Sequence, residues 1–288
     1  MNLPKKSHIR SMWKQFLQKR LIIASLLIFS IQLVQAGYVD TVRIYSPSMK
    51  KSISASVVVP DSYRNSSNQY PVVYLLHGYS GNYRDWVKLV PQLTKYVDQF
   101  KCIVVCPDGG YSSWYWDSPL DSNFRYETHI VAEVVPFIDS AYRTVKDRKG
   151  RAITGLSMGG HGGLFLGWRH SNLFGACGSM SGGVDINSSR SKFDIAKRIG
   201  DSSAYPTRWE EYSVKAVVKK PSEFPLKIII DCGTEDFFYD INKALHQQLL
   251  QLKVKHEYIE RPGGHTWQYW ANAVPYQLLF FQRFFNQQ

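Results

Sequence analysis

The sequence lacks the residue spacings that hold metal ions or phosphate groups. It has four cysteines in 288 residues, but no Cys-x-x-Cys pair, no His-Glu-x-x-His and no Gly-x-x-x-x-Gly-Lys loop. We therefore expect no metal and no other cofactor. The cysteines lie at or beside short apolar segments, which indicates buried free thiols rather than a disulfide framework: Cys102, Cys106, Cys177 and Cys232.

Residues 1–36 contain no acidic residue and carry half of the net charge of +12. A basic stretch there runs into an apolar run at residues 21–31, and residues 34–36 form the small-residue pattern that a signal peptidase cuts. We predict a signal peptide over residues 1–36, cleaved after Ala36, and hence a secreted or periplasmic protein without stable membrane insertion. Met1 and Met12 are both candidate starts, because Met12 gives the more usual signal-peptide proportions.

No stretch of the chain reaches the ~20 apolar residues that a transmembrane helix needs. An uncleaved N-terminal anchor is the alternative to a signal peptide, and no cysteine precedes Cys102 to carry a lipid. Lys215, Lys219 and Lys220 come without a nucleic-acid recognition motif, so we expect a solvated face there and no nucleic-acid partner.

Residues 37–288 show no internal repeat and no Pro/Gly/Ser-rich linker, which predicts one domain. Alternating segments at 38–45 and 53–59 fit an antiparallel pair with one solvated face. Later strands are short continuous apolar runs, as expected where helices cover both faces of a parallel sheet. These runs lie at 72–76, 102–106, 152–154, 176–180 and 228–231, and a less apolar strand is expected at 256–259.

Helix-like stretches separate most of these runs, at 86–100, 128–142, 159–169, 241–252 and 267–285. Repeated alternation of strand and helix predicts a mostly parallel, three-layer α/β sheet. Residues 184–226 interrupt this alternation, because they contain only weak helical signals, prolines and many charges. We therefore predict an insertion over the strand ends there.

A Gly-x-Ser-x-Gly motif occupies residues 155–159. A predicted strand leads directly into it and a helix rich in small residues follows, which is the setting of a nucleophile elbow. The hydroxyl of Ser157 would then stand exposed above the sheet. The alternative is a glycine-rich turn whose serine merely caps a helix.

A serine nucleophile needs a base to take its proton and a carboxylate to orient that base. Among the late histidines, His246 falls in a predicted helix and His256 opens a strand, whereas His265 lies in a loop at a strand's carboxyl end, where ligand sites of such sheets collect. We choose His265. Of the acids Asp231, Glu235 and Asp236, we choose Asp236, because it follows the glycine turn at the mouth of the next helix.

The tetrahedral intermediate needs two backbone donors. One is the amide of Met158, the residue after the nucleophile, and the other is the amide of Tyr79, in the loop that Gly78 allows after an early strand. We interpret His77 as a hydrogen-bonded residue at the strand end rather than as a catalytic group.

Four tryptophans are candidates for substrate binding, because planar rings stack on sugars and phenolic groups. Trp114 and Trp116 belong to an aromatic run at 111–116, and Trp86 and Trp267 adjoin the oxyanion loop and the histidine. Ordinary core packing is the alternative for each of them.

With these motifs the sequence resembles the esterase family of the α/β-hydrolases that holds feruloyl and acetyl xylan esterases, S-formylglutathione hydrolases and the antigen 85 mycolyltransferases. The likeness covers nearly all of residues 38–285. Its markers are residues 74–78, 81–86, 107–109, 126–128, the elbow, 181–183, 232–236 and 264–267.

The resemblance implies an α/β-hydrolase fold, the triad of Ser157, Asp236 and His265, and oxyanion donors at Tyr79 and Met158. It implies a serine esterase that cleaves carboxylic esters, and the predicted export points away from the S-formylglutathione hydrolase branch towards acetyl, feruloyl or other short-acyl esters on carbohydrates. Two alternatives are an acyltransferase that passes the acyl group to a sugar hydroxyl and a non-catalytic carbohydrate-binding module.

Overall fold

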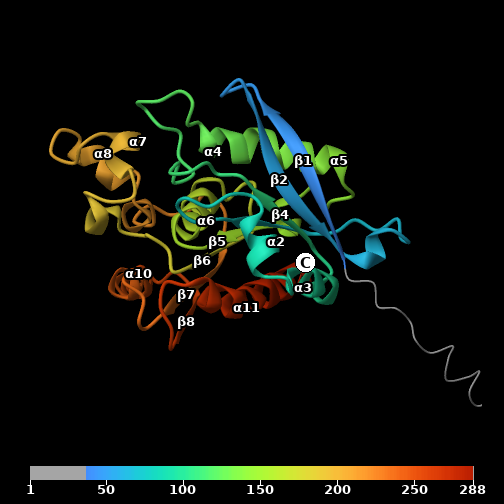
Figure 1. Ribbon diagram of the computed structural model, residues 1–288. Coiled ribbons are helices and arrows are strands. Elements are labelled where there is room, and N and C mark those ends of the chain that lie inside the picture. The colour runs from blue at the N-terminus through green and yellow to red at the C-terminus, as the bar shows by residue number, and fades with distance from the viewer. Residues whose placement is uncertain (1–36, 288) are drawn as a thin grey trace, which may run out of the picture. The chain divides into compact units, whose positions relative to one another are not determined.

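The computed structural model describes residues 37–287, so the predicted signal peptide and its cleavage site lie outside the described residues. Its centre is an eight-stranded sheet in the order β1-β2-β4-β3-β5-β6-β7-β8 (Figure 1). The strands are β1 (Tyr38–Ser46), β2 (Lys51–Val59), β3 (Val72–Leu76), β4 (Ile103–Pro107), β5 (Arg151–Gly155), β6 (Ala176–Met180), β7 (Lys227–Gly233) and β8 (Glu257–Arg261).

Strands β1 and β2 form the predicted antiparallel pair, and β2 is also antiparallel to β4. The remaining neighbours are parallel. In β3, Val72, Tyr74 and Leu76 belong to one core cluster, whereas Val73 and Leu75 belong to the cluster on the opposite face. Burial on both faces explains why this strand is apolar without interruption.

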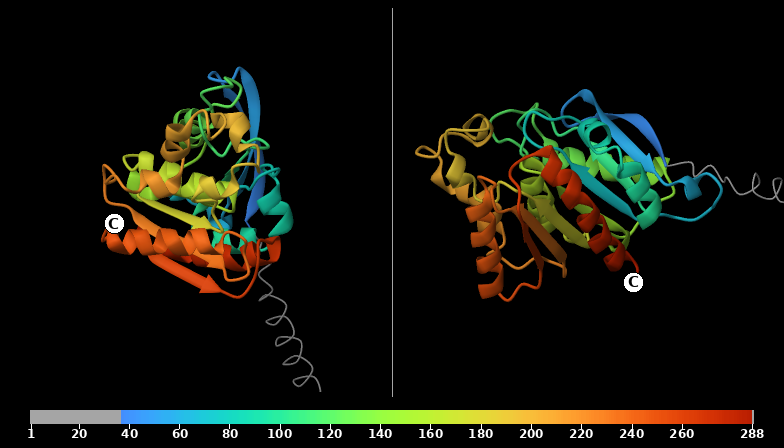
Figure 2. Two further views of the ribbon diagram at one scale, coloured as in Figure 1. Left: turned by 90° about the vertical axis from the view of Figure 1, so that its left-hand side faces the viewer. Right: turned by 60° about the horizontal axis from the view of Figure 1, so that its bottom comes forward.

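Helices cover both faces, and the predicted three-layer α/β fold is confirmed (Figure 2). One face carries α2 (Asp85–Leu89), α3 (Leu93–Phe100) and α11 (Trp267–Phe285). The other carries α4 (Tyr126–Thr128), a π-helical stretch (His129–Val134), α5 (Val135–Ala141), α6 (Met158–Arg169) and α10 (Tyr239–Gln251). Short 3-10 turns lie at Asp61–Tyr63, Arg148–Gly150 and Ile186–Ser189.

Two predicted helices differ from the structure. The stretch at 86–100 is two helices, because Pro91 has no amide hydrogen and disfavours helical backbone at Val90 before it. The stretch at 128–142 begins earlier, at Tyr126, and its middle is π-helical.

Between β6 and β7 lie α7 (Ile195–Ile199), α8 (Pro206–Glu211) and α9 (Val214–Val217), within the stretch for which we predicted an insertion. The four cysteines are free and buried, as predicted. Within residues 37–287, no helix is both long and apolar enough to cross a membrane.

Candidate active site

The serine motif forms a tight turn between β5 and α6. Ser157 has φ 54° and ψ −115°, a conformation that non-glycine residues rarely adopt. A Cβ atom on Gly155 would lie 2.6 Å from the carbonyl oxygen of Leu76, and one on Gly159 would lie 2.5 Å from that of His77. Only glycine at both positions lets α6 begin this close to β3.

Three of the predicted site residues lie together in one hydrogen-bonded chain. His265 Nε2 is 2.9 Å from Ser157 Oγ, and His265 Nδ1 is 2.8 Å from Asp236 Oδ2 and 3.0 Å from Oδ1. The amide of Phe238 donates to Asp236 Oδ1 at 2.8 Å and fixes the carboxylate. The serine and the histidine are 108 positions apart in the sequence.

The partners of His265 determine which nitrogen carries its proton. A carboxylate only accepts hydrogen bonds, so the proton of neutral His265 lies on Nδ1 and the lone pair of Nε2 faces the Ser157 hydroxyl. The Asp236 side chain is fully buried, which strengthens its interaction with the imidazole. The arrangement can take a proton from the hydroxyl and stabilise the resulting imidazolium.

The other sequence candidates lie elsewhere. Asp231 is buried and bound by Arg261 and Tyr269, and burial raises the pKa of its carboxyl. Glu235 is exposed. His246 and His256 hydrogen-bond each other at 2.8 Å.

The loop after β3 contacts the nucleophile. A Cβ atom on Gly78 would lie 3.5 Å from Ser157 Cβ, and Tyr79 lines the same pocket as Ser157. Within the described part of the chain, the amides of Tyr79 and Met158 donate no hydrogen bond. For Met158 this follows from its place at the start of α6, where a helix leaves its first amides without partners. Both predicted oxyanion donors are therefore unpaired.

A pocket of about 570 Å³ opens above Ser157 and His265. Trp267 lines it, as predicted, together with three aromatic residues that sequence reasoning missed: Trp270, Phe193 and Phe237. The position of Phe237, next to Asp236, was a signal that could have been used. Phe193 lies between β6 and β7, and nothing in its local pattern marks it.

The substrate-binding role predicted for the other three tryptophans is wrong. Trp86, Trp114 and Trp116 are at most 1% exposed and do not line the pocket. The indole of Trp86 donates to the carbonyl of Leu76 at 3.0 Å, and that of Trp114 donates to the carbonyl of Phe193 at 3.0 Å. These large apolar rings fill the core, and paired indole N–H groups allow them to be buried there.

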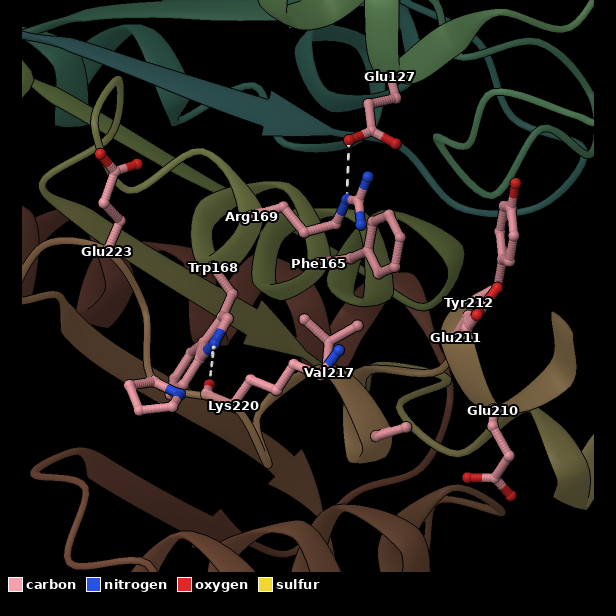
Figure 3. A pocket seen from close by; sticks show the side chains of 12 residues that line it. Glu127, Phe165, Trp168, Arg169, Glu210, Glu211, Tyr212, Val217, Lys220 and Glu223 are labelled. Carbon is pink, nitrogen blue, oxygen red and sulfur yellow. Dashed lines mark hydrogen bonds and ion pairs between the residues drawn. The ribbon is translucent and has the colours of Figure 1, made fainter. Parts of the chain in front are cut away.

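A slightly larger cavity, about 620 Å³, lies between α6 and helices α8 and α9, and none of the predicted site residues lines it (Figure 3). Arg169 crosses it to donate to Glu127 at 2.9 Å, while Glu210 and Glu223 lie at opposite ends. We assign the chemistry to the smaller pocket, which holds the serine. Among the described residues, no three His, Cys, Asp or Glu side chains form a group that could hold a metal ion.

A doubly covered, mostly parallel sheet with a serine elbow and a Ser-His-Asp chain above its strand ends defines an α/β-hydrolase. Residues 46–281 match the model of the family described as "Putative esterase", and the chain belongs to that family.

Similar proteins include enzymes with named ester substrates. The esterase Rv1288 of Mycobacterium tuberculosis (strain ATCC 25618 / H37Rv) is 29% identical over 73% of this chain and 52% of its own, so this chain spans about half the length of that relative. An acetyl esterase of Caldicellulosiruptor saccharolyticus is 25% identical, over 81% of this chain and 94% of its own. A solved ferulic acid esterase has a TM-score of 0.75 and 29% identity, covering 87% of this chain and all of its own.

Proposed function

We propose that this protein hydrolyses carboxylic esters through an acyl-enzyme on Ser157. The observation that carries the proposal is the hydrogen-bonded chain from Ser157 through His265 to Asp236 at the floor of the pocket. Membership in the esterase family supports it. Ser157 is the nucleophile, His265 the general base and Asp236 the residue that orients and stabilises the imidazolium.

The first half-reaction forms the acyl-enzyme. Ser157 Oγ attacks the ester carbonyl carbon while its proton passes to His265 Nε2. The carbonyl oxygen becomes an oxyanion that accepts from the free amides of Tyr79 and Met158. When the intermediate collapses, the carbon–oxygen bond to the alcohol breaks and the alcohol takes the proton from Nε2.

The second half-reaction releases the acid. Water gives a proton to His265 Nε2 and its oxygen attacks the acyl carbon. The second intermediate expels Ser157 Oγ, which takes the proton back, and the carboxylic acid leaves. The residues alone supply this chemistry, and no cofactor enters the proposal.

The substrates we propose are acetyl, feruloyl or other short-acyl esters on carbohydrates. Five aromatic residues line the pocket, and aromatic faces suit both sugar rings and phenolic acyl groups: Tyr79, Phe193, Phe237, Trp267 and Trp270. The names of two similar enzymes, an acetyl esterase and a ferulic acid esterase, support the acetyl and feruloyl groups of this proposal. We also propose export to the periplasm or the medium, from the N-terminal sequence pattern.

The test is a substrate panel run on wild type, Ser157→Ala and Ser52→Ala. Ser52 is an exposed strand residue that does not line the pocket, so its substitution makes the same chemical change outside the site. We expect Ser157→Ala to lower kcat by about 10⁵-fold and Ser52→Ala to leave it unchanged. Acetylated xylan, feruloylated arabinoxylan and short aryl esters are compared side by side.

Two further measurements separate the alternatives. A sugar acceptor added to the reaction distinguishes hydrolysis, which releases free acid, from transfer, which yields a new sugar ester. A serine-reactive fluorophosphonate should label wild type and fail to label Ser157→Ala. Wild type that neither turns over esters nor takes the label would contradict the proposal and favour a binding module.

A further inference from the structure

His161 lies one helical turn after the nucleophile and is completely buried. The rings of Trp114, Trp116 and Phe165 surround it at centroid distances of 5.2–5.4 Å. A histidine in such a place is costly unless both ring nitrogens have partners. The mechanism proposed above does not use it, so its role is a separate question.

Both nitrogens of His161 have partners, and these partners fix its tautomer. The indole of Trp116 donates to His161 Nε2 at 2.9 Å, and an indole N–H can only donate. Nε2 is therefore the acceptor, so the proton of the neutral ring lies on Nδ1. From there it is donated to the carbonyl oxygen of Gly183, 3.2 Å away.

Gly183 in turn contacts the nucleophile. Its amide donates to the carbonyl oxygen of Ser157 at 3.3 Å, and the amide of His161 donates to the same oxygen at 3.0 Å. The two residues thus close a ring of hydrogen bonds around one carbonyl. That carbonyl belongs to the residue whose backbone is strained, with φ 54°. A strained conformation persists only where its surroundings hold it.

We propose that His161 is a positioning residue, which in the Nδ1–H tautomer imposed by Trp116 holds Gly183 against Ser157 and keeps the nucleophile in its reactive conformation. The inference rests on the proposed function of Ser157. It also gives Trp116 a role that differs from the predicted one: the indole acts from within the core, through His161, rather than on substrate.

The two hydrogen bonds of His161 can be removed separately. In His161→Asn the amide nitrogen takes the place of Nδ1, so donation to Gly183 is kept and the acceptor for Trp116 is lost. In His161→Gln the longer amide reaches the place of Nε2, so the acceptor is kept and donation to Gly183 is lost. Trp116→Phe keeps an aromatic ring and removes only the indole donor.

The readouts are kcat and KM for a short aryl ester, the rate of fluorophosphonate labelling, and thermal stability. We expect His161→Gln to lower kcat and the labelling rate by about 10- to 100-fold, the cost of a slightly misplaced reacting group, with little change in KM. His161→Asn should retain a higher kcat and a higher labelling rate than His161→Gln. Trp116→Phe should lower kcat less than His161→Gln does, at unchanged KM.

Matched controls separate positioning from stability. His129 is also a buried histidine, 1% exposed and bound to Glu133 at 2.6 Å, but it lies in the π-helical stretch. His129→Asn and His129→Gln should lower thermal stability and leave kcat unchanged. Equal kcat for the two His161 variants would overturn the proposal. So would a loss of kcat that parallels the loss of thermal stability in both the His161 and the His129 variants.

The imidazole nitrogen spectrum of His161 provides a readout that does not depend on activity. The proposal expects a proton on Nδ1 in wild type, and a proton on Nε2 would overturn it. A wild type that is inactive and unlabelled would instead overturn the function proposed for Ser157, so the two failures are distinguishable. Folded Trp116→Phe with wild-type kcat would also count against the role of His161.

Discussion

The ring of Phe237 lies 4.2 Å from the imidazole of His265, although 62% of Phe237 is exposed. Its plane is tilted by 15° from that of Phe193, 6.4 Å away, and both rings line the pocket. The two nearly parallel rings come from different segments, one of them between β6 and β7. A flat substrate group placed beside them would lose contact with water and gain contact with the two aromatic rings.

This relationship predicts a change in specificity rather than in stability. Phe237→Ala should raise KM for a feruloyl ester by about 10-fold and change KM for an acetyl ester less, because only the larger group covers the lost ring. Its free energy of unfolding should stay within ~0.5 kcal/mol of wild type, as for most exposed sites. Steady-state kinetics on both esters provide the measurement. Phe224→Ala, at an exposed phenylalanine outside the pocket, is the control.

The two neighbouring carboxylates after β7, Glu235 and Asp236, should respond differently to loss of charge. Asp236→Asn should lower kcat by about 10⁴-fold, because an amide no longer holds His265 in the required tautomer. Glu235→Gln is the matched control, since this neighbour is exposed, and its kcat should equal that of wild type. A large loss of kcat in Glu235→Gln with little loss of kcat in Asp236→Asn would instead assign Glu235 as the residue that orients His265.

Two tryptophans in contact should have separate roles. Trp86 and Trp267 meet edge to face at 5.2 Å, but only Trp267 lines the pocket. Trp86→Phe removes the bond to the carbonyl of Leu76 and should lower the free energy of unfolding by about 2 kcal/mol at unchanged KM. Trp267→Ala should raise KM. Denaturant unfolding and kinetics on the same preparations test both, and a raised KM in Trp86→Phe alone would contradict the pocket described above.

The acid dependence of stability should contain a contribution from His161. Burial lowers the pKa of its imidazole from 6.5 to about 3, and no charged group is a cause of that shift. Between these two values the unfolded chain binds a proton that the folded protein does not. Stability therefore falls as the pH falls through this window, by up to about 1.4 kcal/mol per pH unit from this group.

His161→Asn lacks the titrating ring and should show a shallower fall. The difference in unfolding free energy between wild type and variant should shrink from pH 7 to pH 4, as followed by urea unfolding at each pH. Parallel curves for the two proteins would show that the ring does not carry this dependence.

The sequence by itself determined the features that depend on neighbours along the chain. Continuous apolar runs predicted β3 to β7 within about two residues, since both faces of these strands are covered, whereas β8 is only half-buried and came from a less apolar segment. The glycines around Ser157 predicted the elbow, because strand and helix can approach so closely only without side chains. The loop position of His265 followed from the order of strands and helices.

Only the tertiary structure decided what depends on distance and burial. The place of Asp236 after the glycine turn already favoured it, but only the packing of β7 and β8 shows that Asp236 reaches His265 while Arg261 binds Asp231. Trp86, Trp114 and Trp116 are buried and Trp267 is not, although all are equally aromatic in the sequence. The local sequence indicates which contacts a side chain could make. The packing of distant segments determines which of these contacts it makes.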